Sequence, residues 1–98
     1  MAFMDNRRAD RRTDIMARVE ATWVDSEGQK QVVVGMLEET SPHGARVRLP
    51  EPIRVGSRVT LKWLREQFSG TVRHIREWGS GYIVGIQRDG AVVPRRIT

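Results

Sequence analysis

The sequence predicts an all-β domain, a six-stranded antiparallel β-barrel preceded by a flexible, Arg-rich N-terminal arm. Apolar and polar residues alternate in six short runs, which is the side-chain period of a half-buried strand. Turn-forming residues, glycine above all, separate these runs, and no segment of ten or more residues has the apolar spacing of a helix. Closure into a barrel is favoured because it removes the exposed strand edges that make open sheets aggregate.

The length and composition indicate one compact cytoplasmic domain. The chain has 98 residues, of which 39% are hydrophobic and 30% charged, as in a soluble globular protein. No run approaches the roughly 20 apolar residues of a membrane-spanning helix, and the first residues lack the apolar core of a signal peptide. The absence of cysteine excludes disulfides, thiolate metal sites and cysteine nucleophiles.

Residues 1–14 form the predicted arm, and residues 15–98 form the predicted barrel domain. The arm contains Arg7, Arg8, Arg11 and Arg12, several aspartates and almost no apolar periodicity. Such a segment has too little apolar surface to offset its own conformational entropy, so we expect it to be flexible. A short turn over residues 14–18 is compatible with the sequence.

The strands are taken in chain order. Val19, Ala21 and Trp23 alternate with polar residues, and the turn residues 25–28 then lead into a Val-rich run over residues 29–38, which predicts a hairpin. Residues 40–44 break that run. The third strand is indicated by apolar residues at alternate positions, namely Ala45, Val47 and Leu49, with Arg46 and Arg48 between them.

The second half of the barrel begins after Pro50-Glu51-Pro52, a stiff connection because each proline fixes its own φ and extends the residue before it. A fourth strand follows over residues 58–63. A fifth runs from Phe68 through Val72 toward Ile75, and Gly79-Ser80-Gly81 turns the chain into a sixth strand over residues 82–86. Residues 89–94 lack a period, and residues 95–98 are expected to fray.

The net charge of +5 comes almost entirely from arginine, because only Lys30 and Lys62 among the 17 basic residues are lysines. Arginine offers a planar fork of donors that pairs with phosphate and stacks on flat rings, whereas lysine is a hydrated point charge. The bias suits a partner that carries phosphates and rings. A general arginine bias of the genome would produce the same composition, so only the positions of the arginines in the sequence can distinguish the two explanations.

The sequence does not predict an enzyme, a cofactor or a metal site. His43 and His74 lack the spacing of metal ligands, and neither a nucleophile elbow nor a phosphate-binding loop occurs. Glu38 and Glu39 are adjacent, which in a regular strand directs them to opposite faces rather than into a catalytic pair.

Two motifs resemble the signatures of the PilZ domain family. The arm contains RxxxR twice, as Arg7 with Arg11 and as Arg8 with Arg12. The second motif of the family, D/N-x-S-x-x-G, lies between the second and third strands, where this chain has Glu39-Thr40-Ser41-Pro42-His43-Gly44. Ser41 and Gly44 match and Glu39 departs. The later strands are also similar, so the resemblance covers residues 6–88.

The resemblance implies a bacterial β-barrel of PilZ type that binds the second messenger cyclic di-GMP as a nucleotide-responsive adaptor. The implied ligand-binding residues are Arg7, Arg8, Arg11, Arg12, Glu39, Ser41 and Gly44. The arm arginines would pair with the phosphates and stack on the guanines. Glu39 would accept from the guanine N–H donors, and Ser41 would donate its hydroxyl or accept from the loop backbone. Gly44 would adopt positive φ or let a base approach the backbone closely.

Other interpretations of these residues stay open. The arm arginines are also what a solvated tail would contain, and Ser41 and Gly44 are common turn residues. His43 is expected to be exposed, Trp23 and Trp63 to lie in the core, and Trp78 to be a surface aromatic. At the level of function, the alternatives are a PilZ-like module that binds a downstream protein without cyclic di-GMP, and a small basic barrel that binds single-stranded nucleic acid. Neither the downstream protein nor the oligomeric state can be read from the residues.

Overall fold

The structure is a computed structural model that describes residues 13–90, with side chains from Met16 onward. The four arm arginines and the last eight residues lie outside this range. Within it, no helix is long and apolar enough to cross a membrane.

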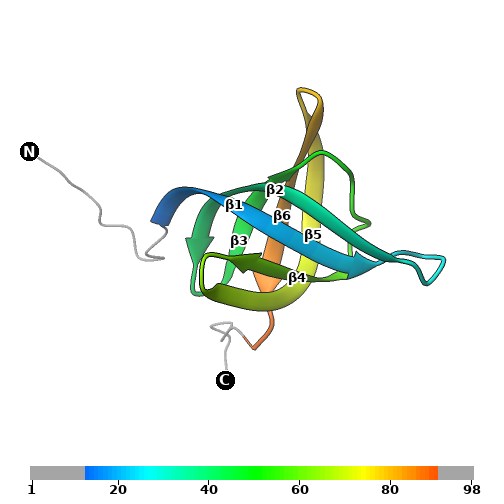
Figure 1. The fold of residues 1–98 in the computed structure, drawn as a ribbon, viewed down its shortest axis with the longest axis horizontal. Helices are drawn as coiled ribbons and strands as arrows, with labels where there is room; N and C mark the ends of the chain where they lie inside the picture. Colours follow the sequence, from blue (N-terminus) through cyan, green and yellow to red (C-terminus); the bar gives the residue numbers. More distant parts are fainter. Residues whose placement is uncertain (1–12, 91–98) are drawn as a thin grey trace, which may run out of the picture.

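Six antiparallel strands close into one barrel, which confirms the predicted fold (Figure 1). Their order around the barrel is β1-β2-β3-β6-β5-β4, so that β1 pairs with both β2 and β4. The strands are β1 (Thr13–Val24), β2 (Lys30–Ser41), β3 (Gly44–Leu49), β4 (Arg58–Trp63), β5 (Glu66–Trp78) and β6 (Gly81–Arg88).

The inward positions of the strands fill the barrel with aliphatic and aromatic side chains. Trp23 and Trp63 are buried, as predicted, and the Trp63 ring meets Phe68 edge to face at a centroid distance of 5.7 Å. Ile53, from the connection between β3 and β4, is also buried among the core residues. The core cluster consists of Val19, Ala21, Trp23, Val33, Leu37, Val47, Leu49, Ile53, Val59, Leu61, Trp63, Phe68, Val72, Val84 and Ile86.

Two strands are longer than the apolar alternation indicates. β1 begins at Thr13, because Thr13 pairs with Thr40 and Asp14 with Glu39, and a register shift stands between Asp14 and Ala17 where the sequence permits a turn. β5 continues to Trp78, which pairs with Gly81 of β6. In both strands, backbone pairing with a neighbour extends the strand past the apolar signal.

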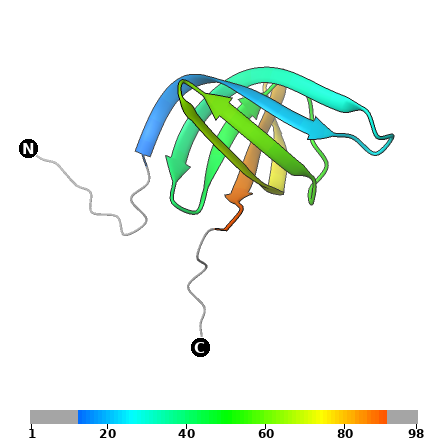
Figure 2. The same cartoon turned by 60° about the horizontal axis from the view of Figure 1, so that its bottom comes forward.

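Pairing brings three chain segments together at one end of the barrel. Thr13 lies beside Thr40, and Gly44 lies beside Gln87, so the start of β1, the β2–β3 hairpin and the end of β6 are neighbours (Figure 2). The β5–β6 hairpin is at the opposite end of β6 and extends beyond the rest of the barrel (Figure 1). The β2–β3 hairpin and the β5–β6 hairpin therefore lie at opposite ends of β6.

Candidate functional site

The β2–β3 turn places Ser41 and Gly44 opposite each other. They are register partners, with Pro42 and His43 at the tip of the turn. The Ser41 Oγ accepts a hydrogen bond from the backbone N–H of His43 at 3.2 Å, and His43 is exposed. This confirms that Ser41 accepts from the loop backbone and that His43 lies at the surface. The hydroxyl retains its own hydrogen for donation to a ligand.

Gly44 is required by the barrel itself. Its φ is not positive, so the left-handed conformation that was one of its two predicted uses is wrong. A Cβ at Gly44 would overlap with the backbone carbonyl of Ile86 in β6. The close approach that this glycine permits is that of β6 to β3, and the predicted approach of a base to the backbone stays a prediction.

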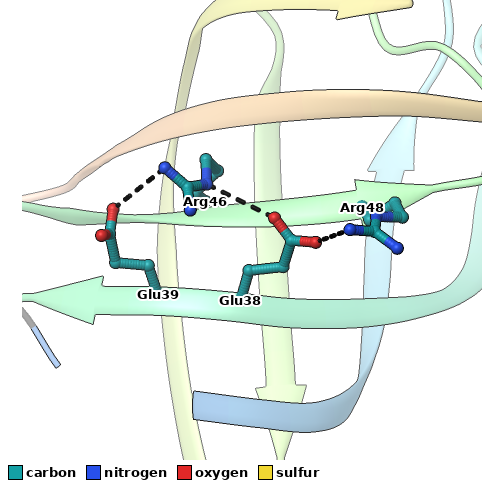
Figure 3. A network of polar contacts seen from close by, with 4 residues as sticks. All are labelled: Glu38, Glu39, Arg46 and Arg48. Carbon is teal, nitrogen blue, oxygen red and sulfur yellow. Dashed lines mark hydrogen bonds and ion pairs between the residues drawn. The ribbon is translucent and has the colours of Figure 1, made fainter. Parts of the chain in front are cut away.

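Glu38 and Glu39 do not point to opposite faces, which corrects the expectation from their adjacency. The register of β2 against β3 shifts between Leu37 and Glu39, so Glu38 is the extra residue of a β-bulge. Both carboxylates then reach Arg46 of β3 (Figure 3). Arg46 Nε lies 3.4 Å from Glu38 Oε1, and Arg46 Nη1 lies 3.5 Å from Glu39 Oε1.

The bulge creates a four-residue ion-pair network on the outer face of β2 and β3. Glu38 also pairs with Arg48 Nη2 through its second oxygen. The side chains of Glu38 and Glu39 are only 9% and 16% exposed, whereas those of Arg46 and Arg48 are 43% and 45% exposed. Two largely covered carboxylates thus hold two guanidinium groups that remain open to a ligand.

The outer face continues from Arg46 across β6 to β5. Gly85 is the register partner of both Arg46 and His74, and inward-facing Val84 and Ile86 flank it, so it faces outward. A Cβ at Gly85 would overlap with the imidazole of His74, which shows that this ring lies directly on the glycine. An exposed flat ring therefore stands in the same row as Glu39 and Arg46.

Sequence reasoning did not assign Arg46, Arg48, Glu38 or His74 to the site. The two arginines had a signal, since they occupy the outward positions of the strand that follows the loop motif. Glu38 had none, because a bulge is not visible in the alternation. The position of His74 depends on the pairing of β5 with β6, which the sequence does not encode locally.

The predicted site is therefore only partly visible. Glu39, Ser41 and Gly44 lie together at the β2–β3 hairpin, as expected from their spacing. Arg7, Arg8, Arg11 and Arg12 lie outside the described residues. Thr13, the first described residue, lies beside Thr40, so β1 begins next to the loop motif.

The described residues thus form a closed β-barrel whose outer face contains arginines, carboxylates and the loop motif. The sequence model of the PilZ domain family matches residues 5–94, and the chain belongs to this family. PilZ domains are receptor domains for cyclic di-GMP and act as binding or adaptor modules rather than as enzymes. No curated protein matches the chain above the significance threshold.

Proposed function

We propose that this protein binds cyclic di-GMP at the face formed by the N-terminal arm, the β2–β3 hairpin and the outer side of β3. The observation that carries the proposal is the pairing of Thr13 with Thr40 and of Asp14 with Glu39. This pairing places the start of β1 beside the loop motif, so the arginine motif that precedes Thr13 in the sequence would lie within reach of that motif.

The charges of the described network support a role for the arm in phosphate binding. Glu38 and Glu39 formally cancel Arg46 and Arg48, so this network offers no net positive charge to a dianionic ligand. The arginines of the arm supply the missing charge. Arg7, Arg8, Arg11 and Arg12 would pair with the phosphates through charge-assisted hydrogen bonds.

Recognition of guanine would fall to the hairpin and its neighbours. Glu39 can accept from the guanine N–H donors, and the Ser41 hydroxyl can donate to the ligand. The His74 ring and the exposed guanidinium of Arg48 provide flat surfaces on which a base can stack. Because none of these contacting groups is hydrophobic, selectivity for guanine over other bases would rest on hydrogen bonding.

We further infer that ligand binding gives residues 1–12 a fixed conformation and so changes contacts with a downstream protein. The arm contains little apolar surface, and ligand phosphates would offset the entropy cost of ordering it. An adaptor of this kind needs no catalytic residues.

Calorimetry with the purified full chain tests the proposal. We expect selective binding of cyclic di-GMP in the micromolar range or tighter, roughly −8 kcal/mol or better. GTP and the linear dinucleotide serve as controls and should bind far more weakly. Absence of heat and of any shift in melting temperature at millimolar cyclic di-GMP would contradict the proposal.

The main competing function is a PilZ module that binds a protein but no nucleotide. It is favoured by Glu39 in place of Asp or Asn, and by the ion pairs that already engage Arg46 and Arg48. Binding of single-stranded nucleic acid has less support, because Trp23, Trp63 and Phe68 are buried and cannot form a stacking platform.

A further inference from the structure

A shallow groove lies at the end of the molecule opposite the β2–β3 hairpin. It has a volume of about 450 Å³ and lies between the β3–β4 connection and the β5–β6 hairpin. Its apolar lining comes from Pro52, Ile53, Val55, Ile75 and Tyr82, and its polar lining from Arg54, Arg76 and Glu77.

The groove is the uncovered end of the barrel core. Along the inward face of β5 and β6, Val72 and Val84 are completely buried, whereas Ile75 and Tyr82 are only partly buried. The β5–β6 hairpin extends beyond the barrel there, and the β3–β4 connection lines the other side of the groove (Figure 1). Val55 of that connection is 52% exposed. Among residues 13–90, no strand covers this part of the core face.

β5 also has an unpaired backbone edge beside this groove. β4 pairs with β5 only from Glu66 to Thr71, and Val72 exchanges hydrogen bonds with Gly56 and Ser57. Beyond that point, no residue in the range 13–90 pairs with this side of β5 up to Trp78. Three consecutive β5 residues, 75–77, line the groove, which places the groove along the strand edge rather than against one face.

The charged residues that line the groove determine which kind of peptide segment can bind there. Two arginines and one glutamate line it, and among residues 16–90 neither Arg54 nor Arg76 has an ion-pair partner. Arg76 lies over the Trp78 ring at 5.5 Å on the outer face of the hairpin. An extended segment with acidic side chains would neutralise these arginines, and the net charge of +5 would attract it.

We propose that residues 73–78 of β5 bind an extended acidic-apolar segment of a partner protein by strand addition, with an apolar side chain of that segment in the groove. Backbone hydrogen bonds from the unpaired edge would supply affinity, and the groove and the two arginines would supply specificity. The edge covers six residues, about 20 Å of strand, which is enough for a short peptide. The inference does not rest on the proposed nucleotide binding, because the groove lies at the end of β6 far from the β2–β3 hairpin, and the two proposed sites share only His74, at the near end of the β5 edge.

The test uses the full chain without nucleotide and three capped hexapeptides. The first alternates glutamate with valine, the second alternates lysine with valine, and the third is the acidic peptide with alternate backbone nitrogens methylated. We expect the acidic peptide to bind at least about tenfold more tightly than the lysine peptide, since charge complementarity separates them. The N-methylated peptide should not bind, and amide chemical shifts should change within residues 73–78.

Matched substitutions locate the site. Val55→Glu and Arg54→Glu should each weaken the acidic peptide by about tenfold. Val32→Glu changes a residue of β2 that is 53% exposed, almost the same as Val55, and Arg65→Glu reverses another exposed loop arginine. Both controls should leave affinity within about twofold. All four positions are exposed, and melting temperatures will confirm that the variants fold.

Several outcomes would overturn the proposal. They are equal affinity for the acidic and lysine peptides, binding of the N-methylated peptide, no binding at millimolar concentration, and an effect of Val32→Glu or Arg65→Glu as large as that of the groove variants. Since cyclic di-GMP is absent from every measurement, such a failure would leave the proposed nucleotide binding untouched.

Discussion

The proposed binding of cyclic di-GMP depends strongly on the residue at position 39, which is Glu39. Its side chain is 16% exposed and one oxygen lies 3.5 Å from Arg46, so it occupies a defined place beside the Ser41 turn. Compared with Asp or Asn at this motif position, Glu has one more methylene and one more bond to immobilise when it meets a base.

We therefore expect Glu39→Asp to raise the affinity for cyclic di-GMP, and Glu39→Ala to lower it. Ordering a longer side chain costs about 0.5–1.5 kcal/mol, which is a few-fold to roughly tenfold in affinity. The alanine variant would leave guanine donors without a partner, at about 1–3 kcal/mol. Dissociation constants at one salt concentration measure both effects, with Glu51→Ala in the β3–β4 connection as the control. If the two Glu39 variants bind like the wild type, position 39 does not touch the ligand.

Gly44 leads to a second prediction at this scale. Gly44→Ala places a methyl group against the backbone carbonyl of Ile86, and backbone in a paired strand cannot move aside as a side chain can. We expect a loss of about 1–3 kcal/mol of stability. In a domain of this size that lowers the melting temperature by roughly 4–8 °C per kcal/mol.

His43→Ala, in the same turn but exposed, is the matched control for this measurement and should change stability by less than about 0.5 kcal/mol. A Gly44→Ala variant that melts like the wild type but no longer binds nucleotide would show that the glycine serves the ligand instead.

At the scale of elements, the β1–β2 hairpin depends on one carboxylate. Asp25 Oδ1 accepts hydrogen bonds from the backbone N–H groups of Gln29 and Glu27, each at 2.9 Å, and Oδ2 accepts one from Gln31 Nε2 at 3.0 Å. The backbone N–H of Gln29 contributes most to lowering the pKa of Asp25 below its ordinary value of 3.8, and the backbone N–H of Glu27 and the side-chain amide of Gln31 contribute further.

A lowered pKa in the folded state means that the ionised carboxylate stabilises the hairpin above the ordinary pKa, and that this contribution is lost as the pH falls through the folded-state pKa. Asp25→Asn should therefore melt below the wild type at neutral pH, with a gap that narrows in acid. Thermal melts from neutral pH to the most acidic buffer in which the barrel stays folded will measure it. The Glu27 side chain accepts no hydrogen bond from residues 16–90, so the Glu27→Gln variant should melt close to the wild type at neutral pH. A gap that stays constant in acid would contradict the role of the charge.

The elements also show why some features can be predicted and others cannot. The first strand could be predicted because its buried residues recur at every second position, namely Val19, Ala21 and Trp23. This spacing is the side-chain period of a strand with one buried face. The bulge at Glu38 inserts one residue without changing any apolar position, so it leaves no pattern. The end of β5 contains Arg76 and Glu77, whose strand conformation depends on pairing with β6. The site residues that meet across strands, such as His74 and Gly85, are set by register.

On the scale of the whole molecule, we expect the arm to serve ligand binding and the barrel to provide the stability of the fold. The described residues already form a closed barrel with a continuous core. The arm arginines are therefore expected to matter for the ligand and not for the stability of the free protein.

Arg8→Ala and Arg12→Ala should each weaken cyclic di-GMP binding while leaving the melting temperature of the free protein nearly unchanged. Loss of one charge-assisted hydrogen bond costs about 1.5–3 kcal/mol, which is roughly tenfold to a hundredfold in affinity. Arg65→Ala removes the same charge from the exposed β4–β5 turn and is the control for the general electrostatic effect. A large drop in the melting temperature of the arm variants would assign these arginines to the fold.

The contact between Gly44 and Ile86 also bears on how such a chain changes over evolutionary time. In a lineage that lost nucleotide binding, substitutions at positions 39 and 41 and at the arginines of the arm would be tolerated. It would still be held to glycine at position 44, because any larger residue there pushes two strands of the barrel apart. The residues at positions 39 and 41 would therefore indicate whether a lineage still binds the nucleotide, whereas glycine would be retained at position 44 in either case.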